Sequence, residues 1–120
     1  MLKNRDFKRV YENAESLADK YLVVYILKNE SEENRLGISV SKRIGNSVTR
    51  NRIRRRIKEY LRVFGNALLQ GTEGFDFVVL ARKPAAEADF HILGESLKRL
   101  ITKAIVKNEK NVNQNDRAIP

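Results

Sequence analysis

One stretch of the sequence, residues 42–62, holds nearly all of the chain's surplus positive charge. It contains one acidic residue, Glu59, and nine basic residues: Lys42, Arg43, Arg50, Arg52, Arg54, Arg55, Arg56, Lys58 and Arg62. The stretch therefore carries a formal charge of +8, against +9 for the whole 120-residue chain. Seven of the nine basic residues are arginine, whose planar guanidinium group binds phosphate oxygens in pairs and stacks on bases. This concentration predicts binding to a polyanion, with nucleic acid as the first candidate.

The same stretch has the spacing of an amphipathic helix that begins near Val48. Its apolar residues fall on one stripe, formed by Ile53, Ile57, Tyr60, Leu61 and Phe64, and most of the arginines point away from that stripe. A solvated helix face of the ordinary kind would mix Glu with Lys in i,i+4 pairs, so we interpret this face as a binding surface. Arg50 lies on the azimuth of the apolar stripe, and we expect it to reach past the end of the core.

Groups that could carry out catalysis are scarce. The chain has no cysteine and one histidine, His91, which lies off the apolar stripe of its predicted helix and is expected on the surface. Glu30, Glu32 and Glu33 form an acidic cluster in a polar loop, which we interpret as solvated and not as a metal site. No phosphate-binding glycine loop and no carboxylate pair in an apolar setting is present. If the chain belongs to an enzyme, its catalytic groups belong to a partner.

The remaining sequence predicts an α+β fold, an α/β sandwich in which helices pack against a small central sheet. The predicted order is α-β-β-α-β-α, with helices at 4–18, from about 48 to 64, and 90–106, and strands at 21–28, 36–41 and 75–82. The second and third strands flank the basic helix and are expected to pair in parallel. On spacing alone, Phe7 and Tyr11 of the first helix are core anchors. Residues 107–120 are polar and rich in asparagine, which predicts a disordered tail after a single domain, residues 1–106.

Composition also bears on where the protein works. Its pI is about 10.0, and no apolar run approaches the 18 residues of a membrane span. The first 20 residues are charged throughout, unlike a signal peptide. We therefore expect a soluble, cytoplasmic, monomeric protein without a membrane partner.

Residues 36–59, LGISVSKRIGNSVTRNRIRRRIKE, resemble the signature of the bacterial ribonuclease P protein subunit. The resemblance rests on a GISVS strand, on a turn and on an R-N-R helix, with Lys42, Gly45, Asn46, Val48, Arg50, Asn51, Arg52 and Arg54 to Arg56 at the matching positions. It extends to Asp6, Phe7, Val10 and Tyr11, to Tyr25 in its strand, and to VVLARKPAA at 78–86. In total it covers residues 1–106.

This resemblance implies an endoribonuclease holoenzyme in which a catalytic RNA does the chemistry and the protein assists. The complex would remove the 5′ leader of precursor tRNA by Mg²⁺-dependent hydrolysis, with no metal or cofactor bound by the protein alone. The residues implied to bind the catalytic RNA are Lys42, Arg43, Asn46, Arg50, Asn51, Arg52, Arg54, Arg55, Arg56 and Arg62. A separate cleft, formed by the first helix and one sheet face, would take the single-stranded leader on Phe7, Tyr11 and Tyr25. The family fold also implies a left-handed β-α-β crossover around the basic helix, against the usual preference.

The sequence departs from the family pattern at two places. Asp19 stands where the family often has asparagine, which argues against a leader or metal contact from this loop. The tail is asparagine-rich where the family tail is often lysine-rich, so contacts between the tail and RNA should be weak.

Three other functions stay open. One is an RNA-binding protein of ribosomal type without a processing role. The second is a DNA binder, which the core stripe of the basic helix disfavours. The third is a protein-only nuclease, which the missing acid–base and metal groups disfavour.

Overall fold

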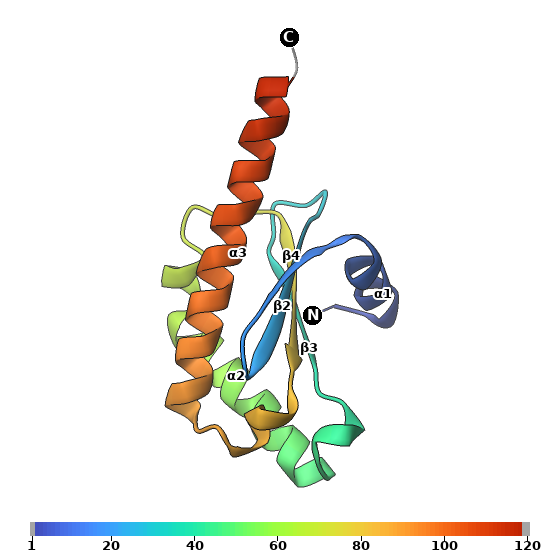
Figure 1. Cartoon of the computed structure of the whole chain (residues 1–120), viewed down its shortest axis with the longest axis vertical. Coiled ribbons are helices and arrows are strands. Elements are labelled where there is room, and N and C mark those ends of the chain that lie inside the picture. The colour runs from blue at the N-terminus through green and yellow to red at the C-terminus, as the bar shows by residue number, and fades with distance from the viewer. Residues whose placement is uncertain (1, 119–120) are drawn as a thin grey trace.

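A computed structural model describes the backbone of residues 2–118 and the side chains of residues 2–109. Within this part, three α-helices pack on a small sheet, and two 3₁₀ turns, η1 and η2, precede α2 and α3 (Figure 1). The elements in chain order are α1 (Asn4–Asn13), β1 (Glu15–Ala18), β2 (Leu22–Lys28), β3 (Arg35–Ser39), η1 (Lys42–Ile44), α2 (Ser47–Leu68), β4 (Phe75–Ala81), η2 (Lys83–Glu87) and α3 (Phe90–Ala118). The α+β prediction is confirmed.

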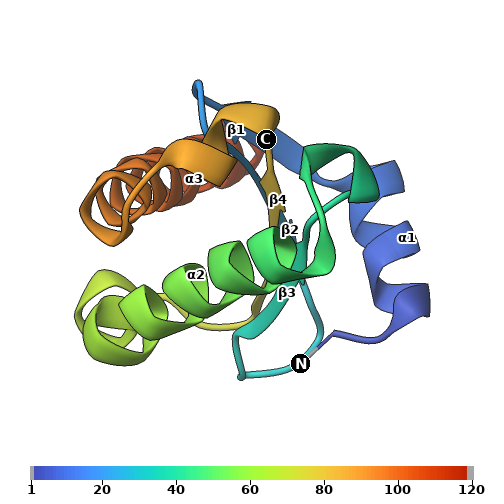
Figure 2. The same cartoon turned by 90° about the horizontal axis from the view of Figure 1, so that it is seen from below.

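The sheet has four strands in the order β1-β2-β4-β3. The β2 strand pairs with its two neighbours in antiparallel fashion, whereas β3 pairs with β4 in parallel, as predicted. Helices α2 and α3 cover one face of the sheet and α1 lies on the other (Figure 2). Strands β3 and β4 run downward in Figure 1, hence toward the viewer in Figure 2, where α2 lies to their left. That path from β3 through α2 to β4 is a left-handed crossover, the exception to the usual rule.

The main core lies between the sheet and the α2–α3 layer. Strand alternation sends Val24 and Ile26 of β2, together with Phe77 and Val79 of β4, into this core, where they are almost completely buried. Helix α3 approaches α2 closely at Gly94, because a Cβ at that position would lie 2.5 Å from Cδ2 of Tyr60. Glycine inside a helix costs about 1 kcal/mol relative to alanine. The structure shows that the missing side chain lets the two helices pack together.

The first helix is shorter than predicted, and a strand occupies the end of the predicted range. Helix α1 ends at Asn13, and the extended backbone of Ala14 leads into β1, in which Ser16 faces Tyr25 of β2. The observed order is therefore α-β-β-β-α-β-α. Pairing with β2 satisfies the backbone of β1, and this tertiary contact overrides the local helical spacing.

The last helix is longer than predicted. The expected disordered tail at 107–120 differs from the structure, in which α3 continues as a helix through Ala118. Adding a turn to an existing helix is much easier than nucleating one, and the apolar stripe that anchors α3 lies upstream, between Leu93 and Ala104. The side chains from residue 110 onward lie outside the described residues.

Candidate nucleic-acid interface

The start of α2 is fixed by side-chain caps. The side chain of Asn46 accepts a hydrogen bond from the backbone N–H of Thr49 at 3.0 Å, which is the usual role of an N-cap residue. Just before it, the hydroxyl of Ser41 accepts a hydrogen bond from the backbone N–H of Arg43 at 3.2 Å and caps η1. Lys42 and Arg43 are exposed at this end of the helix. Two cations and a helix N-terminus therefore lie together, and both features attract anions.

The outer face of α2 forms a shallow basic hollow. The helix buries Ile53, Ile57 and Tyr60 against the core. The residues opposite that stripe line a hollow of about 420 Å³ and are Asn51, Arg54, Arg55, Lys58, Glu59 and Arg62. Within this basic face, Arg54 donates a hydrogen bond to Oδ1 of Asn51 at 3.2 Å. The helix therefore presents cationic side chains from a rigid, core-anchored element, as the binding of RNA phosphates requires.

Glu59 modifies the charge of this face. Arg62 donates two hydrogen bonds to the Glu59 carboxylate, at 2.5 and 3.1 Å. The hydrogen bond from Arg62 lowers the pKa of Glu59, so the pair is ionised at neutral pH. One of the predicted RNA-binding cations is thus already paired with a carboxylate.

Two of the predicted RNA-binding arginines are engaged by the fold. Arg52 donates to the carbonyl oxygen of Ala86 at 2.9 Å, and Arg56 donates to that of Ala88 at 2.6 Å. Both carbonyls belong to the η2 segment and the residue after it, so these guanidinium groups fasten α2 to the approach of α3. Arg50 is half-buried, with its Nε atom fully enclosed. The ten residues of the prediction are therefore not equivalent.

The three predicted aromatic residues lie together on the opposite face of the sheet. The rings of Phe7 and Tyr11 are 6.3 Å apart between centroids, and Tyr11 meets Tyr25 edge-on at 5.0 Å. Tyr11 is 41% exposed, whereas Phe7 is half-buried over β3. A Cβ at Gly37 would lie 2.5 Å from Cζ of Phe7, so the ring rests directly on the strand backbone. This aromatic cluster offers stacking surface of the kind that takes unpaired bases.

The sheet beside the aromatic cluster is only partly covered. Val23 pairs in register with Leu80, and Ser39 pairs with Leu80 from the other side. All three are half-buried and share the sheet face of Tyr25. Strand alternation places Val23 on the face of Tyr25, two residues away. The register that brings Leu80 beside Val23 and Ser39 beside Leu80 is set by the sheet and has no signal in the local sequence.

The sequence reading also missed a buried charge, Asp76 in β4. Its side chain is completely buried and pairs with Arg9 of α1 and with Arg35 of β3 at 2.8 Å. Burial alone would raise the pKa of Asp76, but hydrogen bonds from Arg35 and Asn29 and the nearby cations outweigh it and hold the pKa below its usual value. A lone aspartate inside the apolar strand FDFVVLA was the available signal, because such a charge needs a partner.

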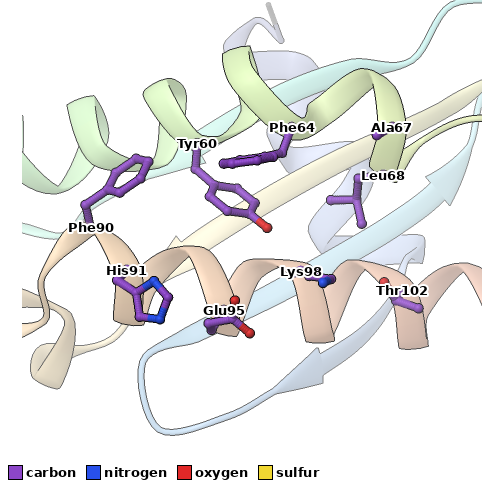
Figure 3. Close-up of a pocket in the computed structure, with 9 residues that line it drawn as sticks. All are labelled: Tyr60, Phe64, Ala67, Leu68, Phe90, His91, Glu95, Lys98 and Thr102. Atoms are coloured by element: carbon purple, nitrogen blue, oxygen red, sulfur yellow. The ribbon is translucent and has the colours of Figure 1, made fainter.

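A second hollow, of about 560 Å³, lies between α2 and α3. Tyr60 and Phe64 of α2 and Phe90 of α3 supply its rings, with centroids 4.9 and 6.1 Å from that of Tyr60 (Figure 3). Glu95 and Lys98 of α3 lie across from these rings. The exposed His91 also lines this hollow, on the surface as predicted. No motif in the sequence pointed to this groove.

Among the described residues, no group of three or more His, Cys, Asp or Glu side chains is placed to hold a metal ion. No helix in the described part of the chain has the length and apolarity needed to cross a bilayer.

Comparison with known proteins decides the family. The family model described as Ribonuclease P matches residues 1–105. The chain belongs to the ribonuclease P protein family. The ribonuclease P protein component of Caldanaerobacter subterraneus subsp. tengcongensis is 44% identical over 108 residues, 90% of each chain. That of Clostridioides difficile is 46% identical over 99 residues, which cover 82% of this chain and 85% of the relative.

Solved structures agree with this family membership. The RNase P protein of Staphylococcus aureus superposes with a TM-score of 0.76 at 38% identity, over 87% of this chain and 93% of the other. The RNase P protein of Thermotoga maritima gives a TM-score of 0.76 at 33% identity, over 85% and 94%. The chain is therefore similar to members of its family in both sequence and fold.

Proposed function

We propose that this chain is the protein subunit of a ribonuclease P ribonucleoprotein, which removes the 5′ leader of precursor tRNA. In this proposal the catalytic RNA supplies the reactive groups and the Mg²⁺ sites, and the protein contributes two binding surfaces. The supporting observation is that the basic face of α2 and the aromatic cluster lie on opposite faces of one sheet. One surface can then bind the catalytic RNA while the other holds the leader.

The basic face of α2 is the surface proposed to bind the catalytic RNA. Arg54, Arg55 and Lys58 stand on the outer face of a helix whose other side is buried. Cations that are fixed in this way neutralise phosphates without reading a base sequence, as recognition of a folded RNA by its shape and backbone requires. Lys42, Arg43 and the capped start of α2 extend this surface.

The aromatic cluster is the surface proposed to take the leader. Stacking on an aromatic ring contributes about 1–3 kcal/mol per base and tolerates any base, which suits a leader that differs between tRNA precursors. Tyr11 has the most exposed ring of the three, and Phe7 and Tyr25 flank it. The half-buried Val23, Leu80 and Ser39 continue the surface along the sheet.

The test is cleavage of precursor tRNA by the purified chain together with its catalytic RNA. At low Mg²⁺ the mixture should cut at the leader junction faster than the RNA alone, and the chain alone should not cut. Cleavage by the chain alone would support a protein-only nuclease. No gain over the RNA alone would support the ribosomal-type alternative.

The two surfaces can be tested separately. The double variant Arg54→Ala, Arg55→Ala should weaken assembly with the catalytic RNA. The double variant Phe7→Ala, Tyr11→Ala should assemble normally and lose preference for leader-bearing over mature tRNA. Equal losses in both measurements for both variants would refute the division into two surfaces.

A further inference from the structure

Helix α1 is attached to the sheet by little apolar surface. It has 10 residues, of which only Asp6 and Val10 are buried. The apolar cluster that joins it to the sheet has three buried members, Leu2, Val10 and Val78, with half-buried Phe7, Ala14, Tyr25 and Leu27 packed against them. A helix of this length is marginal on its own, so polar contacts must contribute to its position.

Those polar contacts meet at Asp76. Its Oδ1 accepts from Nε of Arg35 at 2.8 Å and from the side-chain amide of Asn29 at 2.9 Å. Its Oδ2 accepts from Arg35 at 2.8 Å and from Arg9 of α1. Arg35 in turn lies 3.7 Å from the carboxylate of Asp6, also on α1. Two charged residues of α1 are therefore tied, directly or through Arg35, to one buried carboxylate in the central strand.

The two residues of α1 that contact Asp76 or Arg35 lie close to its two aromatic residues in the sequence. Asp6 precedes Phe7, and Arg9 lies two residues from both Phe7 and Tyr11. A shift of α1 would carry both rings with it and would change the 5.0 Å contact between Tyr11 and Tyr25. Because removing one partner of a buried ion pair leaves the other charge uncompensated, loss of Asp76 should free α1 from this position.

We propose that Asp76 is a positioning residue for leader binding: through Arg9, Arg35 and Asp6 it holds α1 so that the rings of Phe7 and Tyr11 face the sheet as a stacking surface. The role in leader binding rests on the proposed function, whereas the attachment of α1 does not. Asp76 itself lies beneath α1, fully buried, and acts only through the residues it holds.

The variants that test this are Asp76→Asn, which keeps the shape and removes the charge, and Arg9→Met, which removes the α1 partner from a more exposed position. The matched control is Arg99→Met, which removes an arginine of α3 from a carboxylate in the same way. Asp19 is also a carboxylate that accepts from an arginine, with Arg99 and Ser96 of α3 both at 2.5 Å. It fastens α3 and not α1.

The first measurement is amide hydrogen exchange of the free protein. Asp76→Asn and Arg9→Met should accelerate exchange within residues 4–13 selectively, and Arg99→Met should not. Uniform acceleration along the chain, or none in α1, would overturn the proposal. Because Arg9→Met leaves the buried core intact, it decides the question even if Asp76→Asn fails to fold.

The second measurement is the affinity of the assembled holoenzyme for leader-bearing and leaderless tRNA. Both test variants should lower the leader preference by about fivefold or more, the effect of losing one stacked base, with unchanged affinity for the catalytic RNA. Arg9→Met should leave the slope of log affinity for the leader against log salt unchanged. If Arg9 itself contacted a leader phosphate, the variant would reduce that slope by about 0.7. An unchanged leader preference, or an equal loss in Arg99→Met, would overturn the positioning role. If the unmodified holoenzyme has no leader preference, the proposed function fails, and hydrogen exchange alone decides how α1 is held.

Discussion

The arginines of α2 should separate into two classes when they are replaced by alanine. Arg52 and Arg56 donate to the carbonyl oxygens of Ala86 and Ala88, at 2.9 and 2.6 Å. A hydrogen bond from a charged donor contributes about 1.5–3 kcal/mol, and partial exposure reduces this to about 1–2 kcal/mol each. In a domain of this size, 1 kcal/mol corresponds to about 4 °C in melting temperature. Arg52→Ala and Arg56→Ala should therefore each lower the melting temperature by about 4–8 °C.

Arg54 and Arg55 should behave in the opposite way. Their side chains line the outer hollow of α2, so Arg54→Ala and Arg55→Ala should leave the melting temperature almost unchanged. Each should instead reduce the slope of log affinity for the catalytic RNA against log salt by about 0.7–0.9, the amount for one phosphate contact. Calorimetry of the free protein and RNA titrations at four or more salt concentrations measure the two effects independently.

Arg56→Lys is the matched control, because it keeps the charge but replaces the planar fork by a single ammonium group. It should keep the salt slope of the unmodified protein and recover only part of the stability that Arg56→Ala loses. The reasoning is refuted if Arg52→Ala and Arg56→Ala melt like the unmodified protein while Arg54→Ala and Arg55→Ala melt early. In that case the contacts to the η2 segment would contribute nothing to the fold.

Three further predictions concern single positions. Glu59→Gln should free Arg62, raise the affinity for RNA and steepen the salt slope by at most about 0.9; a weaker complex in the same titration would contradict this. Gly94→Ala should lower the free energy of unfolding in urea by about 1 kcal/mol, because overpacking against Tyr60 costs about 1–3 kcal/mol and the helix gains only about 1 kcal/mol. A more stable variant would show that the ring moves aside easily. Because the pKa of Asp76 is lowered in the folded state, its stabilisation is present above its unfolded pKa of about 3.9 and is lost as the pH falls below that value. The stability gap between the unmodified protein and Asp76→Asn should therefore narrow in urea titrations from pH 6 to pH 2, and a constant gap would exclude this linkage.

The elements that sequence predicted well are those with strong local signals. The basic helix has a cap, a long apolar stripe and an arginine face. The structure places it at Ser47–Leu68, so its start was predicted closely and its end lies four residues beyond the expected one. Strands β2 and β4 were predicted from β-branched and aromatic runs and were found within one residue of their expected ends. Local patterns of this kind predict an element correctly where the spacing of its apolar residues matches the residues that the fold buries.

The elements that were missed depend on distant partners. The four residues of β1 follow a helix and lack a strand-like composition, so only β2 makes them a strand. Arg52 and Arg56 are four residues apart and so share one side of α2, but nothing in the local sequence shows what lies beside that side. This depends on where the carbonyl groups after β4 lie in space, which is set by the crossover. The residue type determines which contacts a side chain can make, whereas the fold determines which groups lie close enough to make them.

The central strand explains how one small domain can present two surfaces without mixing them. Residues of β4 alternate between the faces: Phe77 and Val79 pack beneath α2 and α3, while Asp76 and Val78 pack beneath α1. The α2 layer rests on a large apolar core, whereas α1 rests on a small one supplemented by ion pairs. The face proposed for the catalytic RNA is therefore built rigidly, and the face proposed for the leader depends on a single carboxylate. Because the residues of β4 alternate between the faces, a change at Asp76 or Val78 should affect the α1 side, and a change at Phe77 or Val79 should affect the α2 side.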